Sequence, residues 1–157
     1  MSLALNWLFP TGLGAQPSEL AEGLVDPAGG AQANTRLAAA SKLTWQKDLD
    51  QTLEMARRHK KMVLVDVYTD WCGWCHKLDR DTYTNPEVIS FVNSQFICLK
   101  IDAEDGGKGE RFARTYRVTA FPCIILLDAT GKKVGAFYGY RSADQFPDAV
   151  RQVMTRG

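Results

Sequence analysis

The sequence lacks a surplus of charge of either sign. Its 157 residues carry 19 Lys and Arg against 18 Asp and Glu, which leaves a formal net charge of +1. Proteins that bind nucleic acid or an acidic membrane surface by electrostatics need a clear excess of basic side chains. The charge balance therefore predicts no nucleic-acid partner.

Long apolar runs and cysteines are also scarce. No stretch approaches the roughly 18 consecutive apolar residues of a membrane-spanning helix, so we expect no membrane span in this chain. The four cysteines are too few to staple a chain of this length as a disulfide scaffold. Hydrophobic residues make up 45% of the chain, enough for a core, and the length favours one main domain, which we expect to be a monomer.

Residues 1–40 differ in composition from the rest of the chain. The apolar segment from Leu3 to Leu13 is interrupted by proline and glycine, and it lacks the basic residues that precede the apolar part of a secretory signal. Alanine, glycine and small polar residues follow up to Ala40. We interpret 1–40 as the remnant of a removed leader, a linker or a loosely ordered arm, with a helix over 18–22 as the alternative. Residues 41–157 are then the domain.

Periodicity in residues 41–157 predicts alternating helices and strands. Thr44 can cap a helix that carries Trp45, Leu49 and Leu53 on one side and ends at the basic cluster before Met62. Further predicted elements are strand 62–68, a helix after Cys72, a helix from Asn85-Pro86, strand 96–101, helix 108–116, a hairpin of strands 123–127 and 134–138, and a closing helix capped by Ser142 and Gln145. Helices between strands predict an α/β fold with a central mixed sheet covered on both faces.

Two chemistries compete for the stretch at Cys72 and Cys75, which lies where a predicted strand meets a helix. A C-x-x-C at this position indicates a thiol/disulfide redox pair, whereas the same letters with His76 spell the C-x-x-C-H signature of covalent haem attachment. Small c-type cytochromes are largely helical, so the neighbouring strands favour the redox pair and leave a haem electron carrier as the alternative. A structural zinc site needs about four ligands, and no second C-x-x-C supplies them. We expect no metal and no cofactor.

Disulfide exchange needs a thiolate and a second thiol that releases the mixed disulfide. Cys72 opens the predicted helix, where unpaired N–H groups and the helix dipole stabilise a thiolate. We therefore predict that Cys72 is the nucleophile, titrating below a free thiol, and that Cys75 is the resolving thiol. Asp66 lies in the apolar strand upstream. It is either a buried acid that exchanges a proton with Cys75, or a carboxylate that reaches solvent or a hydrogen-bond donor.

These residues resemble the thioredoxin-fold proteins. The landmarks that match the family in order and approximate spacing are Val65-Asp66, Trp71 to Cys75, Ala120-Phe121-Pro122, Gly131 and Gly139. Over roughly residues 43–155, Trp45 and the segment Thr82–Val88 make the chain similar to the C-terminal thioredoxin-like domain of the DsbD thiol:disulfide interchange proteins and their soluble relatives.

The resemblance implies a thioredoxin-like fold and a protein-disulfide oxidoreductase, acting as reductase or isomerase. Its partners would be protein thiols and disulfides and an upstream redox donor. The implied catalytic residues are Cys72, Cys75 and Asp66, with Cys72 and Cys75 as the redox-active disulfide. The implied substrate-binding residues are Trp71, Gly73, Trp74, Phe121 and the cis-proline Pro122. A thioredoxin-fold module used only for protein interaction is the alternative.

The resemblance and a removed leader suggest the bacterial periplasm, or another extracytoplasmic location, with a cytoplasmic role as the alternative. Two departures concern the site. The lysine that thioredoxin places beside its buried acid corresponds to Cys98 in our alignment, so we expect no lysine-assisted proton transfer. Trp74 replaces the proline of thioredoxin or the histidine of disulfide isomerases, so the reduction potential does not carry over.

The segment from Asp102 to Pro122 is longer than in thioredoxin and is expected to reshape the surface near the site. Cys98 and Cys123 lie in strand-like apolar runs. Free cysteine commonly packs as a small buried hydrophobe, so we expect structural roles for both, with a redox role of Cys123 as the alternative.

Overall fold

The computed structural model describes residues 42–156, so the interpretation of residues 1–40 lies outside the described part of the chain. The elements are β1 (Trp45–Gln46), α1 (Leu49–His59), β2 (Met62–Tyr68), α2 (Gly73–Lys77), the π-helix η1 (Leu78–Thr82), α3 (Pro86–Gln95), β3 (Phe96–Asp102), α4 (Lys108–Thr115), β4 (Cys123–Leu127), β5 (Lys133–Tyr138) and α5 (Phe146–Arg156).

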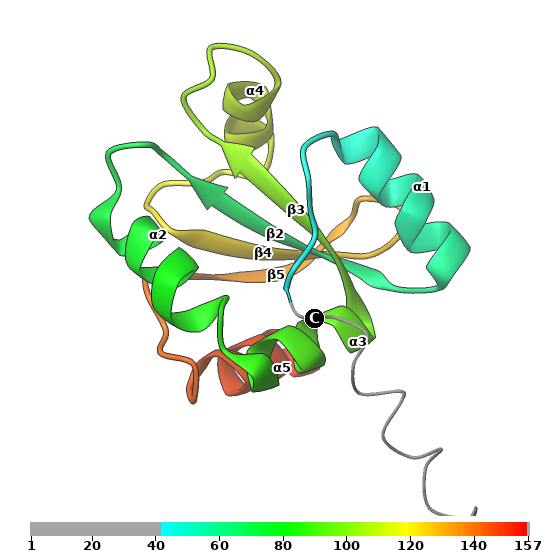
Figure 1. Ribbon diagram of the computed structural model, residues 1–157. Helices are drawn as coiled ribbons and strands as arrows, with labels where there is room; N and C mark the ends of the chain where they lie inside the picture. Colours follow the sequence, from blue (N-terminus) through cyan, green and yellow to red (C-terminus); the bar gives the residue numbers. More distant parts are fainter. Residues whose placement is uncertain (1–41, 157) are drawn as a thin grey trace, which may run out of the picture. The chain divides into compact units, whose positions relative to one another are not determined.

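A five-stranded sheet in the order β1-β3-β2-β4-β5 forms the centre. The pairs β1–β3 and β2–β3 are parallel, whereas β4 runs antiparallel to β2 and forms a hairpin with β5. The parallel connection from β2 to β3 passes through α2, η1 and α3 (Figure 1). The predicted α/β fold with a mixed central sheet is confirmed.

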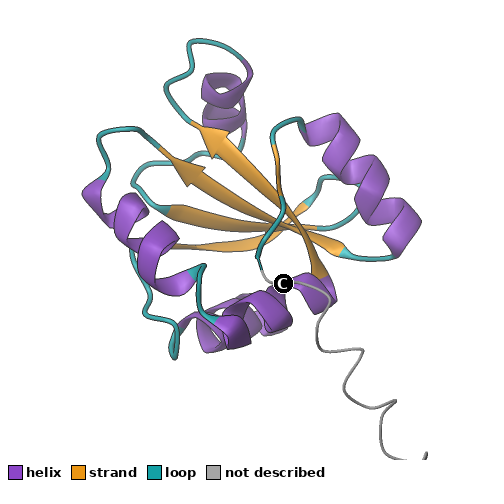
Figure 2. Cartoon of the chain, viewed as in Figure 1, coloured by secondary structure: helices purple, strands orange, loops and turns teal. Residues whose placement is uncertain are grey.

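Helices cover both faces of the sheet. In Figure 1, α1 and α4 lie above the strands, and α3 and α5 lie together below them. Figure 2 shows that α2 begins in the loop that leaves one end of β2. None of the helices within residues 42–156 has the length and apolar character to cross a membrane.

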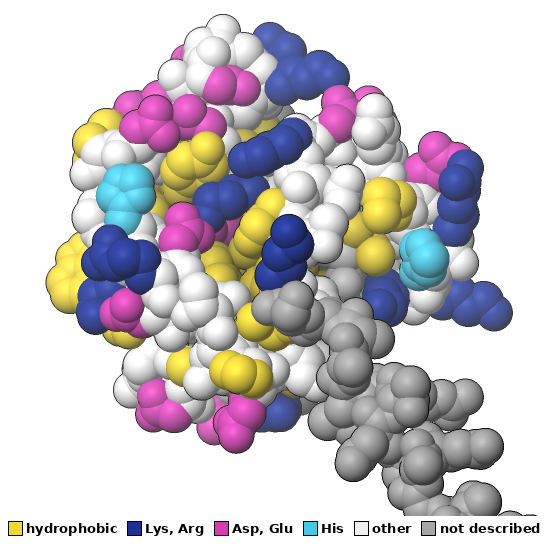
Figure 3. Space-filling view, viewed as in Figure 1, with side chains coloured by type: hydrophobic (Ala, Val, Ile, Leu, Met, Phe, Trp, Pro, Cys, Tyr) yellow, Lys and Arg dark blue, Asp and Glu magenta, His cyan; other side chains and the backbone are white. Residues whose placement is uncertain are grey.

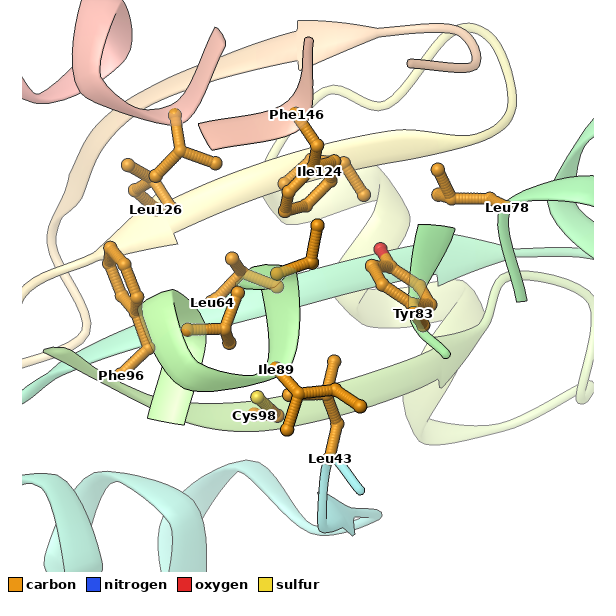
Figure 4. Packing of buried hydrophobic residues seen from close by; sticks show 13 residues of the cluster. Leu43, Leu64, Leu78, Tyr83, Ile89, Phe96, Cys98, Ile124, Leu126 and Phe146 are labelled. Carbon is orange, nitrogen blue, oxygen red and sulfur yellow. The ribbon is translucent and has the colours of Figure 1, made fainter. Parts of the chain in front are cut away.

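The central strands divide the apolar residues between the two faces. On β2, Val63, Val65 and Val67 belong to the core beneath α1 and α4, whereas Leu64 belongs to the core beneath α3 and α5. Successive side chains of a strand point to opposite faces, so a continuous apolar run is what a strand covered on both faces requires. Figure 4 shows the second of these cores, in which Leu64 packs with residues of α3, β3, β4 and α5.

The predicted start of the first helix is wrong. Trp45 and Gln46 form the short strand β1, and α1 begins at Leu49 with Asp48 as its N-cap; Oδ1 of Asp48 accepts from the N–H of Gln51 at 3.1 Å. Pairing of β1 with β3 satisfies the backbone at Trp45, and this tertiary contact outweighs the helical spacing of the sequence. The cap at Asn85 is confirmed, because its Oδ1 accepts from the N–H groups of Glu87 and Val88.

Candidate active site

Cys72 and Cys75 are joined by a disulfide at the start of α2, with their Cα atoms 5.2 Å apart. Cys72 is the N-cap of this helix, and its Sγ accepts a hydrogen bond from the N–H of Cys75 at 3.1 Å. The N–H of Cys72 itself donates to the carbonyl of Thr69, directly after β2. The end of β2 and the first turn of α2 thus hold one sulfur where backbone N–H groups stabilise a thiolate.

Exposed aromatic side chains flank the disulfide. Trp71 is 68% exposed and Trp74 is 60% exposed, whereas Cys72 is 5% exposed and Cys75 1%. Trp71 meets Phe121 edge to face with ring centres 6.0 Å apart, and its Nε1–H donates to Glu104 at 2.8 Å. Gly73, between the cysteines, has open space around its Cα. Two large aromatic rings are thus exposed next to the buried cysteines in the sequence.

A second aromatic contact involves Trp74, the residue before Cys75. Trp74 contacts Tyr140 with ring centres 5.7 Å apart, and together with Gly139 these residues line a hollow of about 310 Å³. On the face shown in Figure 3, acidic and basic side chains are interspersed, and hydrophobic side chains reach the surface between them.

The segment before β4 completes the site. The Phe121–Pro122 peptide is cis, as the resemblance implied, and the carbonyl of Pro122 accepts from the N–H of Gly139 at 2.8 Å. Within residues 42–156, the main-chain groups of Ala120 and Phe121 take part in no hydrogen bond between main-chain groups. These groups are available to an extended peptide.

Asp66 is fully buried, so it does not reach solvent. Its Oδ2 accepts from Nζ of Lys100 at 3.1 Å, and Lys100 also forms an ion pair with Asp79. Burial raises the pKa of Asp66 to about 6, and the positive charge of Lys100 offsets part of that effect. A carboxyl group with this pKa can take up or release a proton near neutral pH.

The expectation that Cys98 stands beside the buried acid is wrong. In the parallel pair of β2 and β3, Asp66 is opposite Lys100, and Cys98 is opposite Leu64. Cys98 and Lys100 are two positions apart on β3, so their side chains point to the same face of the strand. The hydrophobic pattern alone therefore does not tell which of the two lies opposite Asp66. A lysine, Lys100, therefore stands beside the buried acid, contrary to the expectation from the sequence.

The ammonium group of Lys100 lies among three aromatic rings, a contact that the sequence did not predict. Its Nζ lies 5.2, 5.1 and 5.6 Å from the ring centres of Trp45, Tyr68 and Tyr83. Burial by itself would lower the pKa of Lys100, but the charges of Asp66 and Asp79 outweigh it and raise that pKa. The available signal was strand alignment, because Asp66 and Lys100 are each the fifth residue of a seven-residue strand.

Cys98, Cys123 and His76 are the other residues that the sequence analysis considered near the site. Cys98 and Cys123 are free and buried, and burial is the main cause that raises their pKa values to about 12 and about 11. Nε2 of His76 lies 2.8 Å from the carbonyl oxygen of Asp70. Burial therefore keeps the Cys98 and Cys123 thiols protonated at neutral pH.

A mixed sheet with a C-x-x-C pair at the strand-to-helix junction and a cis-proline before the hairpin defines the thioredoxin-like class. The chain belongs to the thioredoxin-like domain family, whose model matches residues 49–154. Family membership and the strand–C-x-x-C–helix arrangement assign the motif to a thiol pair rather than to haem attachment.

Two relatives and one solved structure indicate the part of the family to which the chain is similar. It is 27% identical over 108 residues to the disulfide bond reductase DsbH of Chlamydia pneumoniae, covering 64% of this chain and 65% of that protein. It is 27% identical over 125 residues to the thiol:disulfide interchange protein DsbD of Vibrio vulnificus, covering 78% of this chain and 21% of that protein. The chain thus spans about two thirds of one relative and about a fifth of the other.

The oxidised C-terminal domain of Neisseria meningitidis DsbD has the same fold. It superposes with a TM-score of 0.60 at 22% identity, covering 69% of this chain and 98% of the domain. At this identity the likeness concerns the fold.

Proposed function

We propose that the protein is a thiol–disulfide oxidoreductase that reduces or rearranges disulfides of protein substrates. The observation that carries the proposal is the Cys72–Cys75 disulfide at the start of α2, with the Cys75 N–H directed at Cys72 Sγ. Similarity to a protein named as a disulfide bond reductase supports the reductive direction.

In the reductive direction, the Cys72 thiolate attacks one sulfur of a substrate disulfide and forms a mixed disulfide, releasing the other substrate sulfur as a thiolate. Cys75 loses its proton and attacks Cys72, which releases the second substrate sulfur. The substrate gains two electrons, and the protein becomes the Cys72–Cys75 disulfide. A partner dithiol must then reduce the Cys72–Cys75 disulfide. This dithiol is the upstream redox donor in the proposal.

Asp66 is the residue that we propose accepts the Cys75 proton. It is the buried acid on β2, the strand that leads into the disulfide, and its pKa of about 6 lets it be deprotonated at neutral pH. Lys100 holds one of its oxygens from the neighbouring strand. A carboxylate that is oriented by a lysine and has a pKa below the working pH is a suitable base.

The substrate in this proposal is an extended segment that presents its disulfide to Cys72. Trp71, which contacts Phe121, and the exposed Trp74 supply apolar contact area for that segment. The free main-chain groups of Ala120 and Phe121 can pair with the segment as a neighbouring strand would.

We also propose that the protein works in the periplasm or another extracytoplasmic compartment. The similarity to DsbD supports this location. Osmotic-shock fractionation of the native host, followed by immunoblotting, tests it. Recovery with the cytoplasmic marker would refute this location.

Insulin reduction with dithiothreitol as electron donor tests the proposed function. The wild-type protein should accelerate insulin precipitation, and Cys72→Ser should abolish the acceleration, because a serine hydroxyl cannot form the mixed disulfide. Cys98→Ala is the matched control and should keep its activity. An inactive wild-type protein that still binds reduced insulin would favour an interaction module. Recovery of activity from scrambled ribonuclease then distinguishes an isomerase from a reductase.

A further inference from the structure

Three buried side-chain oxygen atoms have no hydrogen-bond partner within residues 42–156: Oδ1 of Asp66, Oγ1 of Thr69 and the hydroxyl oxygen of Tyr83. Two of these residues, Asp66 and Tyr83, lie against the ammonium group of Lys100. Both side chains belong to buried residues, with Asp66 0% and Tyr83 5% exposed. Buried polar atoms are nearly always hydrogen-bonded in native proteins, either to the protein or to ordered water. Two such oxygens on residues that lie against one ammonium group point to a shared partner.

The two side chains converge on one ammonium group. Nζ of Lys100 lies 3.1 Å from Oδ2 of Asp66 and 5.6 Å from the ring centre of Tyr83. On the β2–β4 ladder, Asp66 is opposite Ile124. Figure 4 shows the Tyr83 ring within the packed core, with its hydroxyl on the side of Leu78 and Ile124. The Tyr83 hydroxyl therefore lies on the side of Ile124, the residue opposite Asp66 on the ladder.

The chemistry of the two groups is complementary. Burial, and then the negative charges of Asp66 and Asp79, raise the pKa of Tyr83 well above the ordinary value of a phenol. The Tyr83 hydroxyl therefore stays protonated, and it can act as a hydrogen-bond donor. Oδ1 of Asp66 is an acceptor whose partner oxygen Lys100 already holds. No direct hydrogen bond joins Tyr83 to Asp66. One water that accepts from the Tyr83 hydroxyl and donates to Oδ1 of Asp66 would satisfy both atoms.

We propose that Tyr83 is a positioning residue for disulfide exchange, whose buried hydroxyl donates through one bound water to Oδ1 of Asp66. Lys100 and Tyr83 then hold the two carboxylate oxygens from different elements, β3 and the turn between η1 and α3. The inference rests on the proposed function, because it concerns the group that we propose accepts the Cys75 proton. Its consequence is that Tyr83 helps to set the pH above which Asp66 is available as a base.

Other ionisable groups act on Asp66 as well, and the test must leave them unchanged. They come from β2, β3, β4, η1 and the segment before α1: Tyr68, Lys100, Cys98, Cys123, Asp79 and Lys47. A change at Tyr83 that removes only the hydroxyl preserves all of these charges. Tyr83→Phe is that change.

Tyr116→Phe is the matched control, because it also removes a hydroxyl, one that donates to the carbonyl of Gly131 at 2.7 Å on the opposite face of the sheet. The experiment follows the carboxyl carbon of Asp66 by NMR across pH in the reduced protein. In parallel, stopped-flow kinetics measure how fast Cys75 releases a mixed disulfide at Cys72.

We expect Tyr83→Phe to move both midpoints upward by about half a pH unit to one unit, because the carboxylate loses one hydrogen bond. Tyr116→Phe should move neither. Unchanged midpoints in a folded Tyr83→Phe protein would overturn the proposal. If this variant does not fold, a high-resolution crystal structure of the wild-type protein decides: the proposal requires one water within hydrogen-bond distance of both oxygens, and a dry contact overturns it.

Failure of the proposed function gives a different result. A wild-type protein without insulin-reducing activity, but with an Asp66 midpoint that moves in Tyr83→Phe, would keep the water-mediated contact and refute only the proposed reaction. An active wild-type protein with an unmoved midpoint would refute only the role of Tyr83.

Discussion

The two faces of the sheet are built from neighbouring residues but differ in character. The face beneath α1 and α4 is lined on the central strands by apolar side chains and Cys123. The face beneath α3 and α5 has an equally buried core, but it also contains Asp66, Lys100 and Tyr83. One residue of β2, Asp66, separates the two faces in character.

The difference shows where the fold accepts a cost for chemistry. A buried carboxyl group is expensive, and only one face of this sheet contains one in the described residues. That carboxyl group lies on the strand leading to Cys72. Because its pKa is raised, its contribution to the free energy of unfolding depends on pH. The other face, with no comparable acid among its described residues, should be indifferent to pH.

The largest expected difference concerns the thiols. Each face holds one free cysteine, Cys98 or Cys123, and burial raises their pKa values to about 12 and about 11. At pH 8 roughly one Cys98 side chain in ten thousand is a thiolate. Iodoacetamide at pH 8 should therefore label Cys72 in the reduced, folded protein at least about a thousandfold faster than Cys98. Peptide mass spectrometry over time measures this ratio, and labelling of all sites at similar rates would contradict it.

Adjacent residues of β4 allow a matched comparison of the two cores. Ile124→Ala and Ile125→Ala remove the same atoms from fully buried positions on opposite faces, and each should lower the free energy of unfolding by about 2–5 kcal/mol. Because Ile124 is opposite Asp66, its truncation should admit water and lower the pKa of Asp66. Ile125→Ala should leave that pKa unchanged. Urea unfolding and NMR titration of the Asp66 carboxyl carbon measure both effects, and an equal pKa change in the two variants would refute the distinction.

Removal of the lysine should harm the polar face. Lys100→Met leaves the Asp66 carboxylate buried without its ion-pair partner, so we expect a loss of about 3 kcal/mol at pH 8. At pH 5 the loss should be smaller, because Asp66 without Lys100 is protonated there. Urea unfolding at the two pH values tests this, with Lys108→Met, an exposed lysine, as the control. A loss that does not depend on pH would argue against the ion pair as its cause.

Removal of the acid should have the opposite sign. The pKa of Asp66 is raised from 3.8 to about 6, so the folded state binds a proton more tightly than the unfolded state. The contribution of Asp66 to the free energy of unfolding is therefore largest below about pH 4, and it is lost as the pH rises through 6. Asp66→Asn should therefore stabilise the protein by about 1–3 kcal/mol at pH 8 and have little effect at pH 4, although it slows exchange. Destabilisation at pH 8 would contradict this sign.

Sequence patterns located most of the fold and the centre of the site. Nearly continuous apolar runs predicted β2 and β4 with their observed bounds, because strands buried on both faces carry few polar residues. The C-x-x-C motif and Pro122 are local signals, and both lie at the site. Site residues that form a motif within a few positions of one another can be recognised from the sequence in this way.

The rest depended on contacts between distant residues. The register of β2 and β3 brings Asp66 and Lys100 together across 34 positions of sequence, and a displacement by two residues preserves every hydrophobic position. The strand at Trp45 exists because β3 pairs with it, and the π-helix η1 contains Asp79, the second partner of Lys100. No local pattern encodes these contacts, so the electrostatic part of the site required the structure.

The central claim is that Cys72 is the thiol that attacks substrate disulfides. Incubation of reduced Cys75→Ser with a peptide disulfide, followed by intact-mass and peptide mass spectrometry, tests it most directly. We predict one mixed disulfide per protein, located at Cys72, that persists because no resolving thiol is present, and none at that position in Cys72→Ser. No adduct, or an adduct at Cys98 or Cys123, would contradict the claim.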